Sequence, residues 1–355
     1  MNQKILIIQT AFLGDLILST PFFRAVKNLF PDSEIHLIVN QGTEQVLDGN
    51  PDIQKLIPLD KKRIKKNIFR FLEFAFSLRR EKYDLVYSPH FSFRSSILSR
   101  LTGAPIRIGY KESGFSFLHT KSVSRPRLGP HEVDKLFSLL FSSESEYPRG
   151  RERRPYLYLK EADEKKFQTL SSSLKIAEKN YILIAASSLW ETKRMPEEKF
   201  ASVISLILRK RTENVILIGS KADLPIEEKI RSLLGIEPLR EKERSRFLSL
   251  IGKTSLSELS VWIQNAKAVI SNDSSPIHFA SAFNIPTVMI YGATVPAFGY
   301  STLSEKQKIM EITGLKCRPC GIHGGRICPE SHFRCMLDQQ PQKIFDSLEE
   351  ILKEE

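Results

Sequence analysis

The sequence predicts an α/β protein with two doubly wound parallel sheets, each in its own domain. The first observation is that short apolar runs of strand length alternate with helical segments, an order typical of parallel sheets covered by helices. The second is that this alternation stops in a charged stretch, 142–155, and then restarts. The third is the length of 355 residues, which is more than one compact core usually holds.

The first domain is expected at 1–160. It opens with an apolar strand at 4–10, and the amphipathic segment at 15–30 is expected to be the helix that follows. Further strands are expected at 34–40, 83–89 and 106–110.

The second domain is expected at 161–340, and a C-terminal helix at 341–355 is expected to pack back towards the first domain. Its strands are expected at 180–187, 214–220, 268–272 and 287–292, with helices at 196–211 and about 274–283. Ligands of such sheets bind outside the carboxyl ends of the strands. We therefore expect a ligand cleft between the two domains.

Composition and charge narrow the class of protein. Hydrophobic residues make up 41% and charged residues 26%, which is ordinary for a globular protein. No apolar run approaches the ~18 residues that span a bilayer, and the N-terminus does not resemble a signal peptide, so a cytoplasmic protein is expected. Residues 1–160 hold 26 Lys and Arg against 16 Asp and Glu, whereas residues 161–355 hold 27 against 25. The basic first half predicts an anionic partner; no nucleic-acid-binding motif accompanies the charge.

Hydroxyl and cationic side chains follow the strand at 180–187. Ser187 and Ser188 end it, and Lys193 and Arg194 precede the next helix. Hydroxyl donors, a cation and nearby backbone amides can hold a diphosphate. The alternative is a serine-rich turn with a solvated lysine, and this segment alone does not decide between them.

The segment 271–283 combines a strand end with a helix start. A proline at the first helical turn, preceded by Asp273 or Ser274 as a cap, would leave the amides of Ser274 and Ser275 open to an anion. His278 lies about one turn into this helix. The alternative is a well-capped helix with a hydrogen-bonded histidine.

The next strand also ends in small polar residues, among them Gly292 and Thr294. Three successive strand ends of this kind predict a nucleotide-diphosphate pocket. The G-x-G-x-x-G fingerprint and the G-x-x-x-x-G-K-[ST] phosphate loop are both missing, which argues against a dehydrogenase and a P-loop NTPase.

Four segments together resemble one known family. They are FLGDLILSTPFFRAVKNLFPDSEIHLIV near the N-terminus, SSLWETKRMPEEKFA, SNDSSPIHFASAFNIPTVMIYGAT, and the cysteine-bearing CRPC with CPESHFRCM. They resemble the ADP-heptose:lipopolysaccharide heptosyltransferases, glycosyltransferase family nine, and the cysteine segment resembles the heptosyltransferase II branch. The resemblance covers most of the chain in order; residues 60–150 and 221–250 match little.

The resemblance implies a GT-B fold, in which two Rossmann-like domains face a central cleft. It places the acceptor mainly on the first domain and the nucleotide sugar mainly on the second, and it implies inversion at the anomeric carbon. Asp15 aligns with the family's catalytic base. A carboxylate about 3 Å from an acceptor hydroxyl can take its proton. Asp15 could also cap the helix at 15–30, and the two roles are compatible.

The resemblance also assigns the donor residues. Stabilisation of the departing ADP falls to Lys193, with help from Ser187, Ser188 and the amides of Ser274 and Ser275. Asp273 is expected to accept hydrogen bonds from the sugar, and His278 to lie against the diphosphate or sugar.

One position departs from the family pattern. Where some members place a glutamate that holds the ribose, this chain has Lys221, and Asp223 is only a candidate for that role. No D-x-D motif stands near the diphosphate segment. We therefore expect chemistry without a cofactor, and the sequence leaves a need for Mg²⁺ open.

A basic segment at 60–80 mixes cations with phenylalanines. The cations expected to meet the acceptor are Lys61, Lys62, Arg63, Lys65 and Lys66. Such a segment can lie on an anionic membrane surface or bind the phosphates and acidic sugars of a lipid A–core acceptor. The alternative is an ordinary helix whose phenylalanines pack on the sheet while its cations are solvated.

All four cysteines lie near the C-terminus, at Cys317, Cys320, Cys328 and Cys335. Clustered thiols in a cytosolic chain indicate metal or redox chemistry more often than structural disulfides. A structural Zn²⁺ site, reduced thiols in a surface loop and one oxidised pair are the alternatives. We expect this segment to take no part in catalysis.

The main hypothesis is an inverting heptosyltransferase that moves heptose from ADP-heptose to the inner core of lipopolysaccharide at the cytoplasmic face of the inner membrane. A second is a related transferase that uses another nucleotide sugar. A third is a non-catalytic nucleotide-sugar-binding protein in which Asp15 is only a helix cap.

Overall fold

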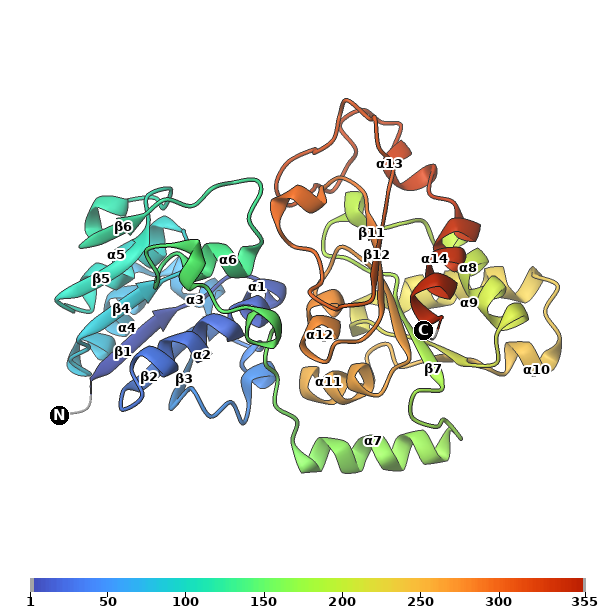
Figure 1. Ribbon diagram of the computed structural model, residues 1–355, viewed down its shortest axis with the longest axis horizontal. Helices are drawn as coiled ribbons and strands as arrows, with labels where there is room; N and C mark the ends of the chain where they lie inside the picture. Colours follow the sequence, from blue (N-terminus) through green and yellow to red (C-terminus); the bar gives the residue numbers. More distant parts are fainter. Residues whose placement is uncertain (1–2, 354–355) are drawn as a thin grey trace. The chain divides into compact units, whose positions relative to one another are not determined.

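The computed structural model describes residues 3–353, without the side chains of 65 and 66. The chain forms two compact units that divide between Tyr158 and Leu159, shown from blue to green and from green to red in Figure 1. Both units have an α/β architecture.

The first unit has six strands, six α-helices and four short 3₁₀ helices among its described residues. Its strands are β1 (Lys4–Ile8), β2 (Glu34–Asn40), β3 (Lys55–Leu59), β4 (Leu85–Ser88), β5 (Ile106–Tyr110) and β6 (Lys121–Val123). Its α-helices are α1 (Leu13–Leu18), α2 (Thr20–Leu29), α3 (Lys61–Lys66), α4 (Ile68–Arg80), α5 (Phe93–Leu101) and α6 (Glu132–Phe137). The 3₁₀ helices are η1 (Glu44–Leu47), η2 (Ser116–Leu118), η3 (Glu144–Glu146) and η4 (Gly150–Arg153).

The second unit repeats this build. Its strands are β7 (Tyr181–Ala185), β8 (Asn214–Leu217), β9 (Phe247–Ser249), β10 (Ala268–Asn272), β11 (Thr287–Tyr291) and β12 (Gln307–Glu311). Its α-helices are α7 (Glu161–Ser173), α8 (Glu197–Lys210), α9 (Leu224–Ile236), α10 (Glu241–Arg244), α11 (Leu256–Gln264), α12 (Pro276–Ala282), α13 (Arg334–Leu337) and α14 (Pro341–Leu352). The 3₁₀ helices are η5 (Glu191–Lys193), η6 (Lys221–Asp223) and η7 (Pro296–Phe298).

Both sheets have the same topology, and all their strand pairs are parallel. The first has the order β3-β2-β1-β4-β5-β6, and the second has β9-β8-β7-β10-β11-β12. This is the classic order of a doubly wound fold, in which the crossover direction reverses beside the first strand. The reversal lies between β1 and β4 in one unit and between β7 and β10 in the other. The predicted α/β fold with two doubly wound sheets is therefore confirmed.

The sequence explains the central strands, because their apolar runs are buried on both faces. Every residue of β7 and β11 is buried, as are four of the five in β1. One face of the first sheet packs on α4 and α5, and one face of the second packs on α8, α9 and α14. At least one face of each sheet is therefore covered by helices.

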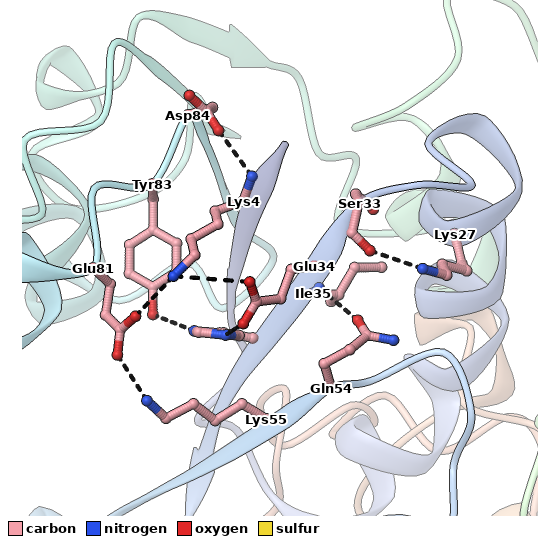
Figure 2. A network of polar contacts seen from close by, with 11 residues as sticks. Lys4, Lys27, Ser33, Glu34, Ile35, Gln54, Lys55, Glu81, Tyr83 and Asp84 are labelled. Atoms are coloured by element: carbon pink, nitrogen blue, oxygen red, sulfur yellow. Dashed lines mark hydrogen bonds and ion pairs between the residues drawn. The ribbon is translucent and has the colours of Figure 1, made fainter. Parts of the chain in front are cut away.

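A polar network joins β1, β2 and β3 to the residues just before β4 in the first sheet (Figure 2). The Lys4 ammonium lies 3.1 Å from the Glu81 carboxylate, which also contacts Lys55 at 2.7 Å. The His36 ring is buried and lies 2.8 Å from both the Tyr83 hydroxyl and the Glu34 carboxylate. These contacts lower the pKa of Glu81 to about 2, through hydrogen bonds from the two lysines.

The helix expected at 15–30 is divided. Helix α1 ends at Leu18, and α2 begins at Thr20 with Pro21 in its first turn. Proline fits the first turn because its missing N–H would have no helical partner there. The Ser19 hydroxyl donates to the Asp15 carbonyl at 2.7 Å and receives a hydrogen bond from the Gln9 amide at 2.6 Å.

The C-terminal helix packs within the second unit. There α14 contacts α8 and the strands β11 and β12, and the expectation that it packs back towards the first domain stays a prediction. Among the described residues, no helix is long and apolar enough to cross a membrane.

Candidate active site

Asp15 lies just beyond the carboxyl end of β1, where the first sheet reverses its crossover direction. It is the third residue of α1, and its Oδ2 accepts a hydrogen bond from the Phe12 amide at 3.1 Å. The expected capping role is therefore present. This hydrogen bond also fixes the position of the carboxylate at the end of the strand.

Three residues that follow β1, β3 and β4 are joined at the carboxyl edge of the first sheet. The Thr10 hydroxyl, after β1, lies 2.9 Å from Nδ1 of His90, which follows β4. The Lys61 ammonium donates to the Thr10 carbonyl. Burial, and then the charge of Lys61, lower the pKa of His90 to about 4. His90 is therefore neutral at physiological pH.

The basic segment is divided between α3 and α4, and those of its cations that the structure describes differ in exposure. Lys61 is half-buried at this edge, whereas Lys62 and Arg63 are exposed. The side chains of Lys65 and Lys66 lie outside the described residues. Asn67 ends α3 and caps α4 by accepting hydrogen bonds from two backbone amides.

A second carboxylate near Asp15 was missed by sequence reasoning. Glu132 at the start of α6 is 5% exposed, and it is 2.5 Å from Arg125 and 3.9 Å from Lys135. Burial raises its pKa most, and the negative charge of Asp15 raises it further. The two carboxylates are 117 positions apart in the sequence, so only the fold brings their charges together.

In the second unit, three predicted donor residues meet on one oxygen atom. The Lys193 ammonium lies 2.5 Å from Oδ2 of Asp273, and the Thr294 hydroxyl donates to the same oxygen at 2.7 Å. The side chains of Lys193 and Asp273 are 14% and 7% exposed. Lys193 follows β7 and Asp273 follows β10, so this cluster lies where the second sheet reverses its crossover direction.

The serines lie on the same edge of the sheet. Ser187 is half-buried, and the buried Ser188 accepts a hydrogen bond from the Trp190 amide at 3.4 Å. Ser275 is the N-cap residue of α12, and its side chain makes no capping hydrogen bond. The cap expected from Asp273 or Ser274 is therefore not formed.

The other two residues predicted to bind the nucleotide sugar are His278, which is buried, and Asp223, which makes local hydrogen bonds. His278 is 4% exposed within α12. Oδ2 of Asp223 accepts hydrogen bonds from the Ser220 amide at 2.7 Å and its hydroxyl at 2.8 Å. Asp223 thus closes the turn after β8, and its contact with a ribose stays a prediction.

The cysteine-bearing segment packs on the loops that follow β7 and β11 at the carboxyl edge of the second sheet, which we did not expect. The Thr192 hydroxyl donates to the Gly325 carbonyl at 3.0 Å and the Gly325 amide donates back at 2.7 Å. The Arg318 guanidinium donates to the carbonyls of Gly292 at 2.5 Å and Thr294 at 2.8 Å. This segment therefore supports the backbone next to Lys193 and at Thr294.

Close packing explains the glycine at 292. A Cβ there would lie 2.8 Å from the Thr192 carbonyl oxygen and 2.5 Å from the end of the Met336 side chain.

A histidine of the cysteine-bearing segment contacts the loop after β7. The His323 ring stacks on Trp190 with a centroid separation of 6.5 Å. Burial, and then the charge of Lys193, lower the pKa of His323.

The four cysteines are free thiols in this structure. Cys335 is buried in the core of the second unit, and burial raises its pKa to about 11. Cys317 lies 3.8 Å from a ring nitrogen of His332. Within residues 3–353, no three His, Cys, Asp or Glu side chains are arranged to hold a metal ion. The zinc site stays a prediction that metal analysis of the purified protein would test.

Residues 71–325 match the model of glycosyltransferase family 9 (heptosyltransferase). The chain belongs to glycosyltransferase family 9. The matched residues include Lys193, Asp273 and Thr294, whereas Asp15 lies before them.

Family 9 relatives match over nearly the whole chain. Lipopolysaccharide heptosyltransferase 2 of Escherichia coli K12 is 24% identical over 99% of each chain. Lipopolysaccharide heptosyltransferase 1 of Campylobacter coli is 28% identical over 88% of this chain and 90% of its own. The solved structure of E. coli ADP-heptose lipopolysaccharide heptosyltransferase II superposes with a TM-score of 0.79 at 23% identity, covering 99% of this chain and 98% of its own. The fold is therefore that of the GT-B heptosyltransferases.

Proposed function

We propose that this family 9 protein moves heptose from ADP-heptose to the inner core of lipopolysaccharide, with inversion at the anomeric carbon. The observation that carries the proposal is the convergence of Lys193 and Thr294 on Asp273 at the reversal point of the second sheet. A cation and hydroxyl groups beside backbone amides suit a diphosphate. Relatives named as heptosyltransferases support heptose as the sugar.

The first unit is proposed to bind the acceptor, with Asp15 as the general base. The carboxylate takes the proton of the acceptor hydroxyl as its oxygen bonds to the anomeric carbon. The bond from that carbon to the phosphate oxygen breaks, and ADP leaves with the electron pair. Attack on the face opposite the leaving group inverts the configuration.

The second unit is proposed to bind the nucleotide sugar. Negative charge grows on the diphosphate as the bond breaks, and Lys193 stabilises it together with the hydroxyls of Ser187 and Ser188 and the amides of Ser274 and Ser275. Asp273 holds Lys193 and accepts hydrogen bonds from the sugar. No residue role here requires a cofactor.

Replacing Asp15 by asparagine tests the base. Turnover should fall roughly 10²–10⁴-fold, because the amide cannot take the proton. The affinity for ADP, measured by calorimetry, should stay unchanged because ADP binds the other unit. Asp32→Asn alters an exposed carboxylate of the same unit and is the matched control. Turnover equal to wild type in Asp15→Asn would remove the base assignment, whereas a wild type that binds ADP without any turnover would favour a non-catalytic protein.

A panel of donors tests the sugar. The purified protein should transfer heptose from ADP-heptose to a truncated inner-core acceptor faster than it transfers hexose from any nucleotide hexose. A preference for a hexose donor would keep the transferase class and replace the proposed sugar.

The basic segment is proposed to meet the acceptor at the cytoplasmic face of the inner membrane. Phe71 and Phe74 pack on the core of the first unit, which agrees with the simpler interpretation for these two rings. Alanine at Lys61 and Lys62 should raise the KM for the acceptor and leave the KM for the donor unchanged. Unchanged values for both substrates would remove the segment from the acceptor site.

A further inference from the structure

Three phenylalanine rings form an exposed cluster on the first unit. Phe93, Phe115 and Phe117 are 44%, 48% and 78% exposed. Phe115 makes edge-to-face contacts with the other two rings, at centroid separations of 6.2 and 5.8 Å. We call these three residues the phenylalanine cluster. Contiguous apolar side chains in water mark an interaction surface more often than isolated ones do.

The backbone of the loop that carries Phe115 and Phe117 is closely constrained. Phe115 has a φ of +60°, a left-handed conformation that is uncommon for a bulky side chain. A Cβ at Gly114 would lie 2.7 Å from Cβ of Phe93, so the loop approaches α5 closely only because residue 114 is a glycine. Helix α5 and η2 are in contact, which joins the two parts of the cluster.

The chain around the cluster is strongly basic. Residues 91–128 hold seven Lys and Arg against one acidic residue, Glu112. One of the seven, Arg125, forms an ion pair with Glu132, and its side chain is only 10% exposed. The Arg94 guanidinium lies over the Phe93 ring at 4.5 Å. Helix α4, which carries the exposed rings Phe69 and Phe76, packs beside α5. Aromatic rings beside cations suit the boundary between anionic headgroups and acyl chains.

We propose that the phenylalanine cluster inserts into the surface of an anionic bilayer while the surrounding cations contact the lipid headgroups. The inference deepens the proposed function, because a lipid-linked acceptor lies in such a surface, and it adds a contact outside the basic segment at 60–80. The apolar rings account for insertion, and the net charge of 91–128 accounts for a preference for anionic lipid.

Vesicle co-sedimentation of the full chain tests this proposal. Wild type should bind vesicles of phosphatidylcholine with phosphatidylglycerol more tightly than vesicles of phosphatidylcholine alone, and added salt should weaken the binding. The double variant Phe115→Ser with Phe117→Ser should bind the anionic vesicles at least about tenfold less tightly. Ile236→Ser is the matched control, because it removes an apolar side chain that is 84% exposed on the second unit, and it should bind as wild type does.

An activity assay separates this proposal from the proposed function. With a soluble, delipidated acceptor the double variant should keep the kcat/KM of wild type, and with the acceptor in vesicles it should lose activity. A protein without transferase activity would end the proposed function, and vesicle binding would still be measurable. Binding of the double variant equal to wild type, or binding indifferent to anionic lipid, would overturn the membrane proposal. An equal loss of activity with the soluble acceptor would also overturn it, because the cluster would then belong to the acceptor site.

Discussion

The ion pair between Lys193 and Asp273 predicts a large effect of a single substitution. In Lys193→Met the carboxylate of Asp273 would stay buried and keep only the hydrogen bond from Thr294. An uncompensated buried charge is strongly destabilising. The variant should therefore lower the free energy of unfolding of the second unit, as well as weakening diphosphate binding.

The magnitude follows from the distance and the burial. At the observed separation of 2.5 Å, two unit charges attract each other by about 7 kcal/mol at an effective dielectric constant of ~20. Desolvation offsets much of this attraction in the intact pair, but removing one partner of such a pair still costs roughly 3–5 kcal/mol. Combining Lys193→Met with Asp273→Asn should recover most of the loss, since no buried charge then remains.

Tryptophan fluorescence during urea unfolding measures the free energy of unfolding of the second unit, where the substitution lies. Both tryptophans of the chain, Trp190 and Trp262, lie in the second unit, and Trp262 is 1% exposed. Arg334→Met is the matched control, because its ion pair with Asp338 has side chains that are 60% and 40% exposed. Such a surface pair contributes about 0–1 kcal/mol. If Lys193→Met lowered the free energy of unfolding by no more than Arg334→Met does, the argument that the pair is buried and coupled would be refuted.

Two other substitutions have effects that the contacts specify. Glu81→Gln removes a carboxylate whose pKa is lowered to about 2 by two lysines (Figure 2), and it should cost roughly 1–2 kcal/mol at pH 7 after solvent screening. A lowered folded-state pKa stabilises the fold above the unfolded-state value of 4.5. The difference between variant and wild type in amide exchange protection of β1 should therefore shrink as the pH falls from 4.5 towards 2; a constant difference would contradict the assignment. Gly292→Ala places a methyl group against the Thr192 carbonyl and should cost about 1–3 kcal/mol through overpacking. Tryptophan-detected unfolding and calorimetric ADP affinity would both report it, and two unchanged values would contradict the close packing.

The sequence predicted the central strands because strands that are buried on both faces consist almost entirely of apolar residues. Runs such as KILII and YILIA are apolar throughout, as strands covered on both faces must be. The outer strands have no continuous apolar run of this kind. Strand β12, with the sequence QKIME, is half-exposed, and β3 contains Pro58, which is compatible only with an edge position or a bulge. Short edge strands take their structure from pairing with a neighbour, and a single sequence does not display that partner.

The sequence by itself determined the two doubly wound sheets and the polar residues at their strand ends, because in a parallel sheet the end of every buried strand leads to the same edge. The tertiary structure alone decided how those residues are joined. Lys193 and Asp273 are 80 positions apart, and Thr192 and Gly325 are 133 apart. No local pattern could therefore show that the first pair forms a buried ion pair, or that the second joins the cysteine-bearing segment to the carboxyl edge of the second sheet. Periodicity along a chain records which side chains are buried, whereas the contacts between distant side chains depend on how strands and helices pack.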